Sequence, residues 1–538
     1  MRNSEHSTKV SVLVASVAAL CSAAAFGAGK PGKAERVGQR CWQDVRILSA
    51  DDMEGRRAGS AGHRRAAEFV ADNFRKAGLQ PVDASGFLQP VHLEARQIVE
   101  ANSSLTLETN GVQRPLKFGD DAGLLLRGDI VREVNAPLTF VGHGLSLPQY
   151  GVDDLRGLDL KGKVVVAFSA APPSVPGSVG AHFGSPAERW KVYKAAGAVG
   201  VMFIPNPYAS DVPWERAVQI RLEPFMVLKG GEDMYGGIKL WAMLNPARLS
   251  LLLEGTGRNA DELLALLKEG KPLPHFDLPS RIKATIDTQV SEVTSENVVG
   301  VLPGSDPELR DELVVLTAHL DHLGVRVLGE GDRIFNGAMD NASGISVLMQ
   351  VARDLKGKRP RRSIVFAAVT AEELGLLGSR AYVADARARG LKIVANLNTD
   401  MFMPLYPMKH VVVFGLSESD LADDARAVAK AMGIEVQADP QPQRNRFIRS
   451  DQYSFIRAGI PALATKIGYA EGSPEQAIDV KWLAERYHAV GDSADQPVDL
   501  RAVGDYENFV RELALRVANR KIAPKWYETS VFSTLAPR

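Results

Sequence analysis

Between about residue 283 and residue 520, short apolar runs alternate with longer segments that predict helices. The apolar runs, which predict strands, are NVVGVLPG, LVVLTAH, SIVFAAVT and KIVANLNTD. Helices are predicted over residues 343–355 and after Gly378. This order is typical of an α/β domain with a mostly parallel central sheet and helices on both faces. In such sheets, functional sites form at the carboxyl ends of the strands.

The segment before this domain carries both kinds of pattern. Residues 44–79 predict two helical pieces around a turn, and Gly78 suits the C-cap of the second piece. From about 90 to 130, alternation of apolar and polar residues predicts strands. We assign residues 28–134 to the N-terminal part of the main domain.

A distinct block follows from about residue 135 to 255. It contains LTFVGHGL, LDLKGKVVVAF and WKVYKAAGAVGVMFI, which predict a turn, a buried strand and a helix followed by another strand. Over residues 140–145, 158–168 and 191–203 it resembles the protease-associated domain, although any small α/β insert could share this pattern. We expect a separately folded insert, followed by a proline-rich linker over residues 256–282.

The first 27 residues have the layout of a secretory signal peptide. Arg2 and Lys9 precede the apolar run VSVLVASVAAL, and small residues follow it. The run is too short to span a bilayer comfortably, and Cys21 follows Leu20 rather than a small residue, which disfavours a membrane anchor and a lipoprotein. We expect cleavage near residues 25–28 and export to the periplasm or outside the cell.

Size and charge set broader limits. A chain of 538 residues predicts two domains, and it has 64 basic and 64 acidic residues. Balanced charge gives no overall field that would attract nucleic acid or an acidic membrane. No second apolar stretch of spanning length follows the signal, so the mature protein has no predicted membrane span. Only Cys41 remains after cleavage, which excludes an intramolecular disulfide.

Acidic and histidine residues follow several of the predicted strands. They are His319, Asp321, Asp340, Glu372, Glu373, Asp400 and His488. Each alone would be an ordinary turn, cap or surface residue, but three strands deliver such residues to the same sheet edge. The set can hold two metal ions and leave one carboxylate as a base. A metal pair of this kind indicates a short list of reactions, mostly hydrolyses.

These residues lie in motifs that resemble a known family. The motifs, over about 285–520, are AHLDHLG, NGAMDNASG, TAEELGLLGSRAY, NLNTDM, RSDQYSF, AGIPA and YHAVGD. They resemble the co-catalytic zinc peptidases, which include leucyl aminopeptidases, glutamate carboxypeptidase and, more distantly, glutaminyl cyclases. The resemblance implies the zinc exopeptidase fold, with a catalytic domain over residues 283–522 and a C-terminal tail over 523–538.

The resemblance also implies a role for each residue. His319 and Asp400 would hold one metal, Glu373 and His488 the other, and Asp340 would bridge them. Glu372 would be the general base acting on a water held between the metals, and Asp321 would orient the His319 ring. The cofactor would be two Zn²⁺ ions, with other divalent metals possible. The peptide bond between Asp340 and Asn341 would be cis.

Other residues carry weaker signals. His322 could support the metal ligands, but we interpret it as a packing or surface residue. Asp492, four residues after His488, could steady that histidine, but we interpret it as a helix cap. Asp451 belongs to a loop that resembles one near the family's substrate pocket. Phe447 and Tyr453 fit the core better than a pocket.

The expected activity is release of N-terminal residues from peptides with a free amine. A carboxypeptidase of the same family is the main alternative. A glutaminyl-cyclase-like acyltransferase fits less well, because the intact His319-x-Asp321 pair favours two metals. A binding protein that has lost its ligands is disfavoured because the whole set is present. A serine hydrolase lacks support, since the chain has no G-x-S-x-G motif. The sequence does not define an oligomeric state.

Overall fold

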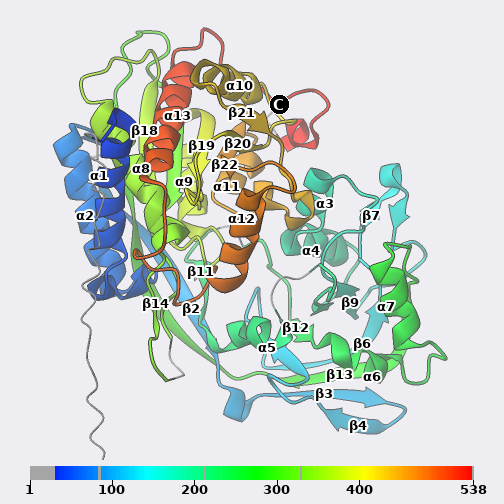
Figure 1. Ribbon diagram of the computed structural model, residues 1–538. Coiled ribbons are helices and arrows are strands. Elements are labelled where there is room, and N and C mark those ends of the chain that lie inside the picture. The colour runs from blue at the N-terminus through cyan, green and yellow to red at the C-terminus, as the bar shows by residue number, and fades with distance from the viewer. Residues whose placement is uncertain (1–30, 83–85, 210–212, 232, 327–329, 536–538) are drawn as a thin grey trace, which may run out of the picture.

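The computed structural model describes residues 31–535 except 83–85, 210–212, 232 and 327–329. The predicted signal peptide lies outside these described residues. The described chain forms two large β-sheets surrounded by helices (Figure 1). Within the same ranges, no helix is both long enough and apolar enough to cross a membrane.

The larger sheet belongs to the predicted α/β domain. Its strands are β1 Gln80–Pro81, β2 Leu88–Ile98, β11 Phe225–Leu228, β14 Thr288–Leu302, β15 Glu312–His319, β18 Ser363–Val369, β19 Lys392–Thr399, β20 His410–Phe414, β21 Glu435–Gln437 and β22 Ala462–Gly468. Their order is β11-β2-β14-β18-β15-β19-β22-β20-β21, with β1 beside β14. The middle strands β18, β15, β19 and β22 are parallel, which confirms the prediction there. The neighbouring strands β14 and β20 pair antiparallel with this group.

Helices cover both faces of this sheet. They are α1 Lys33–Leu48, α2 Ala61–Ala77, α8 Ser343–Asp354, α9 Leu377–Ala388, α10 Leu421–Met432, α11 Gln452–Arg457, α12 Pro474–Glu485 and α13 Leu500–Ala518. Along β15, Val314 and Leu316 join the core under α1, α2, α8 and α13, while Val315 joins the core under α9 and α11. Successive strand residues point to opposite faces, so one apolar strand serves both cores.

The second sheet gathers residues from 104 to 285. Its strands are β3 Ser104–Thr109, β4 Val112–Pro115, β5 Ala122–Leu124, β6 Glu133–Phe140, β9 Val164–Phe168, β10 Gly200–Ile204, β12 Leu240–Leu244 and β13 Phe276–Thr285, in the order β4-β3-β13-β6-β9-β10-β12-β5. The helices of this region are α3 Gly177–Phe183, α4 Pro186–Ala195, α5 Trp214–Ala217, α6 Leu249–Leu253 and α7 Ala260–Lys268. The expected motifs supply β9, α4 and β10.

The boundaries of this unit differ from the expected block. Strands β3, β4 and β5 come from before residue 135, and β13 comes from the expected linker over 256–282. That linker is not an extended connection, because it also contains α7. In β13, Leu278, Ile282 and Ala284 alternate with polar residues and are buried in the core of the second sheet.

The block is also not separate from the larger sheet. Strand β11 lies within residues 135–255, yet it pairs antiparallel with β2, placing Met226 opposite Ala95. Met226 is buried in a small core with Leu93, Ala95 and Ala371. The block therefore forms a sheet and core of its own, but it is not wholly separate, because it also supplies an edge strand of the larger sheet.

The C-terminal tail is packed rather than free. Trp526 and Phe532 are buried in the core under α11. The Trp526 indole Nε1 donates a hydrogen bond of 2.9 Å to the backbone oxygen of Gly459. Residues 523–535 thus complete one face of the larger sheet.

Candidate metal centre

The predicted site residues meet at the carboxyl edge of the parallel strands. His319 is the last residue of β15, Glu372 and Glu373 follow β18, and Asp400 directly follows β19. Asp340 lies in η6 (Ala338–Ala342), the irregular turn before α8. His488 comes from the loop after α12. As predicted, the strand ends bring residues from distant segments together.

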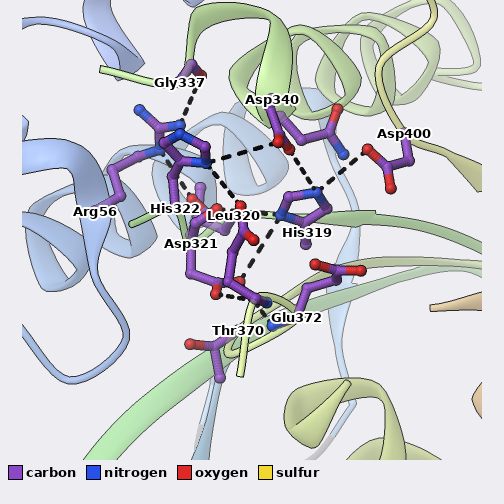
Figure 2. Close-up of polar contacts among 12 residues, drawn as sticks. Arg56, His319, Leu320, Asp321, His322, Gly337, Asp340, Thr370, Glu372 and Asp400 are labelled. Atoms are coloured by element: carbon purple, nitrogen blue, oxygen red, sulfur yellow. Dashed lines mark hydrogen bonds and ion pairs between the residues drawn. The ribbon is translucent and has the colours of Figure 1, made fainter. Parts of the chain in front are cut away.

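The ligand atoms form two groups that share Asp340. The His319 Nε2 lies 3.2 Å from Asp340 Oδ1 and 3.3 Å from Asp400 Oδ1. The His488 Nε2 lies 3.2 Å from both Asp340 Oδ2 and Glu373 Oε2. The Asp340 carboxylate therefore presents one oxygen to each group, and Figure 2 shows it beside His319 and Asp400.

These spacings fit metal coordination. Two donors that each lie about 2.0–2.1 Å from a tetrahedral zinc ion are separated by about 3.3–3.4 Å. The separations of 3.2–3.3 Å between imidazole and carboxylate atoms are close to that value. Two imidazoles and three carboxylates are also donor types that zinc accepts. The residues fit two Zn²⁺ ions, with Asp340 between them.

The electrostatics of the site show an excess of negative charge. Burial lowers the pKa of His488, but the Glu373 carboxylate and hydrogen bonds to Asp340 and Glu373 outweigh it and raise that pKa to about 12. Burial opposes ionisation of Asp340, yet hydrogen bonds from His319 and His488 hold its pKa well below the usual range. The cluster therefore draws positive charge to itself, as a site for cations must.

Glu372 stands apart from these groups. Its carboxylate makes no hydrogen bond or ion pair with any described residue. Burial, opposed by His319 but assisted by Glu373 and Asp400, raises its pKa well above the usual range. A carboxylate that is free and readily protonated is suited to accept a proton.

Asp321 acts differently from the prediction. The His319 Nδ1 donates a hydrogen bond of 3.1 Å to the backbone oxygen of Asp321, while the nearer carboxylate oxygen, Oδ1, lies 3.9 Å away. The carboxylate instead accepts hydrogen bonds from the backbone nitrogens of Glu372 at 3.0 Å and Glu373 at 3.3 Å. Asp321 thus orients the His319 ring through its main chain and fixes the glutamate pair through its side chain.

The backbone around the site adopts uncommon conformations. Ala371, Met401 and His488 have φ values of 54°, 49° and 52°, in the left-handed region. Each is a ligand or lies next to Glu372 or Asp400. Non-glycine residues occupy this region at a cost that the surrounding structure must offset, and they are enriched at functional sites. The peptide bond between Asp340 and Asn341 is cis, as the resemblance implied.

Two residues are closer to the centre than we expected. His322 is buried, and its Nδ1 lies 2.8 Å from Glu373 Oε1. Asp492 is not a helix cap: its carboxylate accepts hydrogen bonds from the backbone nitrogens of Met339 at 2.8 Å and Asp340 at 3.0 Å. The repeated histidine in HLDHLG was the sequence signal for His322, and the position of Asp492 four residues after His488 was the signal for Asp492.

The loop that contains Asp451 also lies near the metal centre. Asp451 is fully buried, and both of its carboxylate oxygens lack a hydrogen-bond partner. Burial raises its pKa to about 7. Phe447 and Tyr453 belong to the core, as expected, and the Tyr453 hydroxyl lies 2.8 Å from the Nδ1 of His182 on α3.

The fold and the site define a class: an α/β metallohydrolase with a co-catalytic pair of metal sites. Residues 297–514 match the family described as Peptidase family M28. This part of the chain is therefore similar to that peptidase family, and it contains two groups of residues that could hold a metal ion.

Individual relatives agree with this assignment. Aminopeptidase YwaD of Bacillus subtilis (strain 168) is 28% identical over 244 residues, which is 43% of this chain and 49% of the relative. A probable zinc metalloprotease of Pyricularia oryzae is 34% identical over 131 residues, 22% of this chain and 25% of the relative. The chain thus spans about half or less of these curated relatives. The structure of an aminopeptidase from Aneurinibacillus sp. strain AM-1, 18% identical, has a TM-score of 0.52 and covers 93% of this chain and 98% of its own, so it shares the fold.

Proposed function

We propose that the protein is an exported zinc aminopeptidase that releases single residues from the N-termini of peptides. The proposal rests on the Asp340 carboxylate, which places one oxygen near His319 and the other near His488. The Glu372 carboxylate makes no hydrogen bond or ion pair with the described residues. A pair of zinc ions bound there would make a water molecule more acidic and polarise the scissile carbonyl.

The residues of this chain divide the remaining work. Glu372 takes a proton from the attacking water and returns it to the departing amine. Asp321 holds the backbone of Glu372 and Glu373, so the base and the ligand keep separate directions. Burial of Glu372 raises its pKa, which makes the carboxylate a stronger base for accepting the proton.

A free α-amine explains why the chain end would be selected. The carboxylates of Asp340, Glu373 and Asp400 give the site negative charge, which attracts a protonated amine. An amine held beside these groups would place the first peptide bond next to Glu372. Such fixed orientation replaces a random encounter and can contribute several kcal/mol. The aminopeptidase relatives support this direction of attack.

The test compares a good peptide substrate with the same peptide acetylated at its N-terminus. We expect the acetylated peptide to be cleaved at least a hundredfold more slowly, with products identified by mass spectrometry. Equal rates would overturn the proposal, and release of residues from the other end would establish a carboxypeptidase. Glu372→Gln protein is the control for contaminating peptidases.

Export is part of the same proposal. It rests on the basic start, apolar run and small residues within the first 27 positions. N-terminal sequencing of protein recovered from the periplasm or medium should give a start near residues 26–29. An uncleaved protein retained in the cytoplasm would contradict it.

A further inference from the structure

Arg56 ends the 3-10 turn η1 (Asp51–Arg56) and is completely buried. Its guanidinium donates hydrogen bonds only to backbone oxygens among the described contacts. The acceptors are Leu320 (Nε, 2.9 Å), Leu48 (Nη1, 2.6 Å), Asn336 (Nη1, 2.7 Å) and Gly337 (Nη2, 2.8 Å). Figure 2 shows the side chain lying between Gly337 and Leu320.

Two of these acceptors lie in the two segments that carry His319 and Asp340, whose side chains meet in the site. Leu320 lies between His319 and Asp321, directly after β15. Gly337 opens the turn that presents Asp340. The planar guanidinium has its donors in a fixed fork, so it sets the separation of the carbonyls it bonds. One side chain therefore links the His319 segment to the Asp340 segment.

The space around this link is tight. Gly337 has φ 58°, and a Cβ there would lie 2.3 Å from the Asp340 backbone oxygen and 2.6 Å from the His322 ring. Gly337 therefore leaves no room for a side chain, and the turn packs directly against Asp340 and His322. Arg56 fixes this turn from the side opposite the ligand atoms.

Arg56 also supplies fixed positive charge. The carboxylates that act on it are Asp492, Asp340, Asp321 and Glu373. Burial lowers its pKa, and these carboxylates limit the fall, so the value is about 10. The guanidinium thus stays charged at neutral pH and offsets part of the charge of the ligand cluster.

We propose that Arg56 is a positioning residue for the metal pair, which holds the His319 and Asp340 segments at the separation that two bridged ions require. The inference rests on the proposed function only in assigning two zinc ions to the site. Arg56 would act through the backbone, because its hydrogen bonds go to backbone oxygens.

The experiment compares Arg56→Lys with Arg189→Lys. Arg189 is an equally buried arginine whose Nη1 and Nη2 donate to the Phe168 and Ala170 oxygens at 2.7 and 3.1 Å, in the second-sheet unit. Zinc stoichiometry and affinity are measured by competition with a chromophoric chelator, alongside kcat, KM and the melting temperature of zinc-free protein. Lysine keeps the charge but loses the fork.

We expect Arg56→Lys to bind at least one zinc ion about 10–100-fold more weakly, as other residues that support metal ligands do. Its kcat should fall while KM stays within about twofold, and Arg189→Lys should keep wild-type zinc affinity. A folded Arg56→Lys protein with unchanged zinc affinity and stoichiometry, and only a lower melting temperature, would overturn the proposal.

A second variant, Arg56→Gly, tests the proposal if Arg56→Lys does not fold. In Arg56→Gly, glycine suits the backbone φ of 50° and leaves space for a guanidinium ion. The protein is refolded with and without millimolar guanidinium. Zinc affinity restored by the ion supports the role, whereas equal affinity in both conditions refutes it. These zinc measurements decide the inference even if wild-type protein cleaves no peptide, which would refute only the proposed function.

Discussion

The adjacent glutamates show how two identical side chains acquire different roles. Asp321 accepts hydrogen bonds from both backbone nitrogens, so both residues are anchored at the strand end. The Glu373 carboxylate then lies against His322 and His488, whereas the Glu372 carboxylate has no such partner among the described residues. This anchoring would allow Glu373 to act as the ligand and Glu372 as the base in the proposed reaction.

Substitution of each glutamate by glutamine separates the roles. We expect Glu372→Gln to keep its zinc content and lose about 10²–10⁴-fold in kcat, because the amide cannot carry the proton. Glu373→Gln should bind zinc more weakly. Zinc content and steady-state kinetics measured on both variants distinguish the two roles. Equal loss of zinc in the two variants would contradict the assignment of Glu373 as the ligand and Glu372 as the base.

Asp492 offers a second test at this scale. It accepts two backbone hydrogen bonds from the turn that carries Asp340, and an asparagine oxygen there is uncharged. Asp492→Asn should lower unfolding free energy by about 1.5–3 kcal/mol, the usual value of a hydrogen bond to a charged group. Zinc affinity should fall roughly tenfold.

Its matched control is Asp495→Asn on the same loop. Asp495 is 87% exposed and pairs with Arg46 at the surface, so its loss should be nearly neutral. Calorimetry and zinc titration would show the difference. Identical behaviour of the two variants would mean that the hydrogen bonds of Asp492 do not support the ligand turn.

At the scale of elements, β11 ties residues from the second unit to the catalytic sheet. Met226 is 5% exposed and packs in a core that includes Ala371, the residue before Glu372. We predict that Met226→Ala lowers unfolding free energy by about 2–5 kcal/mol and reduces activity. Val290→Ala, on β14 of the same sheet but 59% exposed, should stay within about 0.5 kcal/mol of wild type in chemical denaturation. A neutral Met226→Ala would show that β11 contributes little.

The elements also show what sequence patterns could predict. Strands β14, β15, β18 and β19 were predicted, and so were the site residues that follow the last three, because long apolar runs and strand-end acidic residues are local signals. Strand β11 was missed because four residues cannot show a period and their partner is more than a hundred positions away. Strand β13 was hidden by prolines, which suggested a linker although the apolar residues alternate.

The same limit applies within the site. His319, Glu373 and Asp400 were predicted as site residues because they lie at the ends of predicted strands. The role of each residue and the cis peptide bond were implied by the family resemblance. The contact of Asp492 with the Asp340 turn depends on segments 152 residues apart, so no local pattern could predict it.

At the scale of the whole molecule, the metal centre joins parts of the catalytic domain that are distant in sequence. Its ligands span residues 319 to 488, and Arg56 connects them to the N-terminal segment. Without cations, the carboxylates repel one another in a buried place. Metal binding should therefore stabilise the whole domain.

We predict that zinc removal lowers the melting temperature and that zinc, but not magnesium, restores it. Binding to the folded state alone stabilises it by about 4 kcal/mol per ion when free zinc exceeds Kd a thousandfold. Differential scanning calorimetry before and after chelation provides the measurement. An unchanged melting temperature in protein shown to have lost zinc would contradict a buried, folding-coupled site.

Strand β11 has one more consequence. The backbone groups of β2 that face β11 are paired by a segment made more than a hundred residues later. If that segment were removed, the uncovered row of N–H and C=O groups could pair with the same row of another molecule. A shortened protein lacking residues 135–255 would keep every metal ligand, yet β2, β5 and β13 would each lose a strand partner, so we expect it to self-associate. The first consequence of removing the segment would therefore be lower solubility, although the metal ligands remain in the protein.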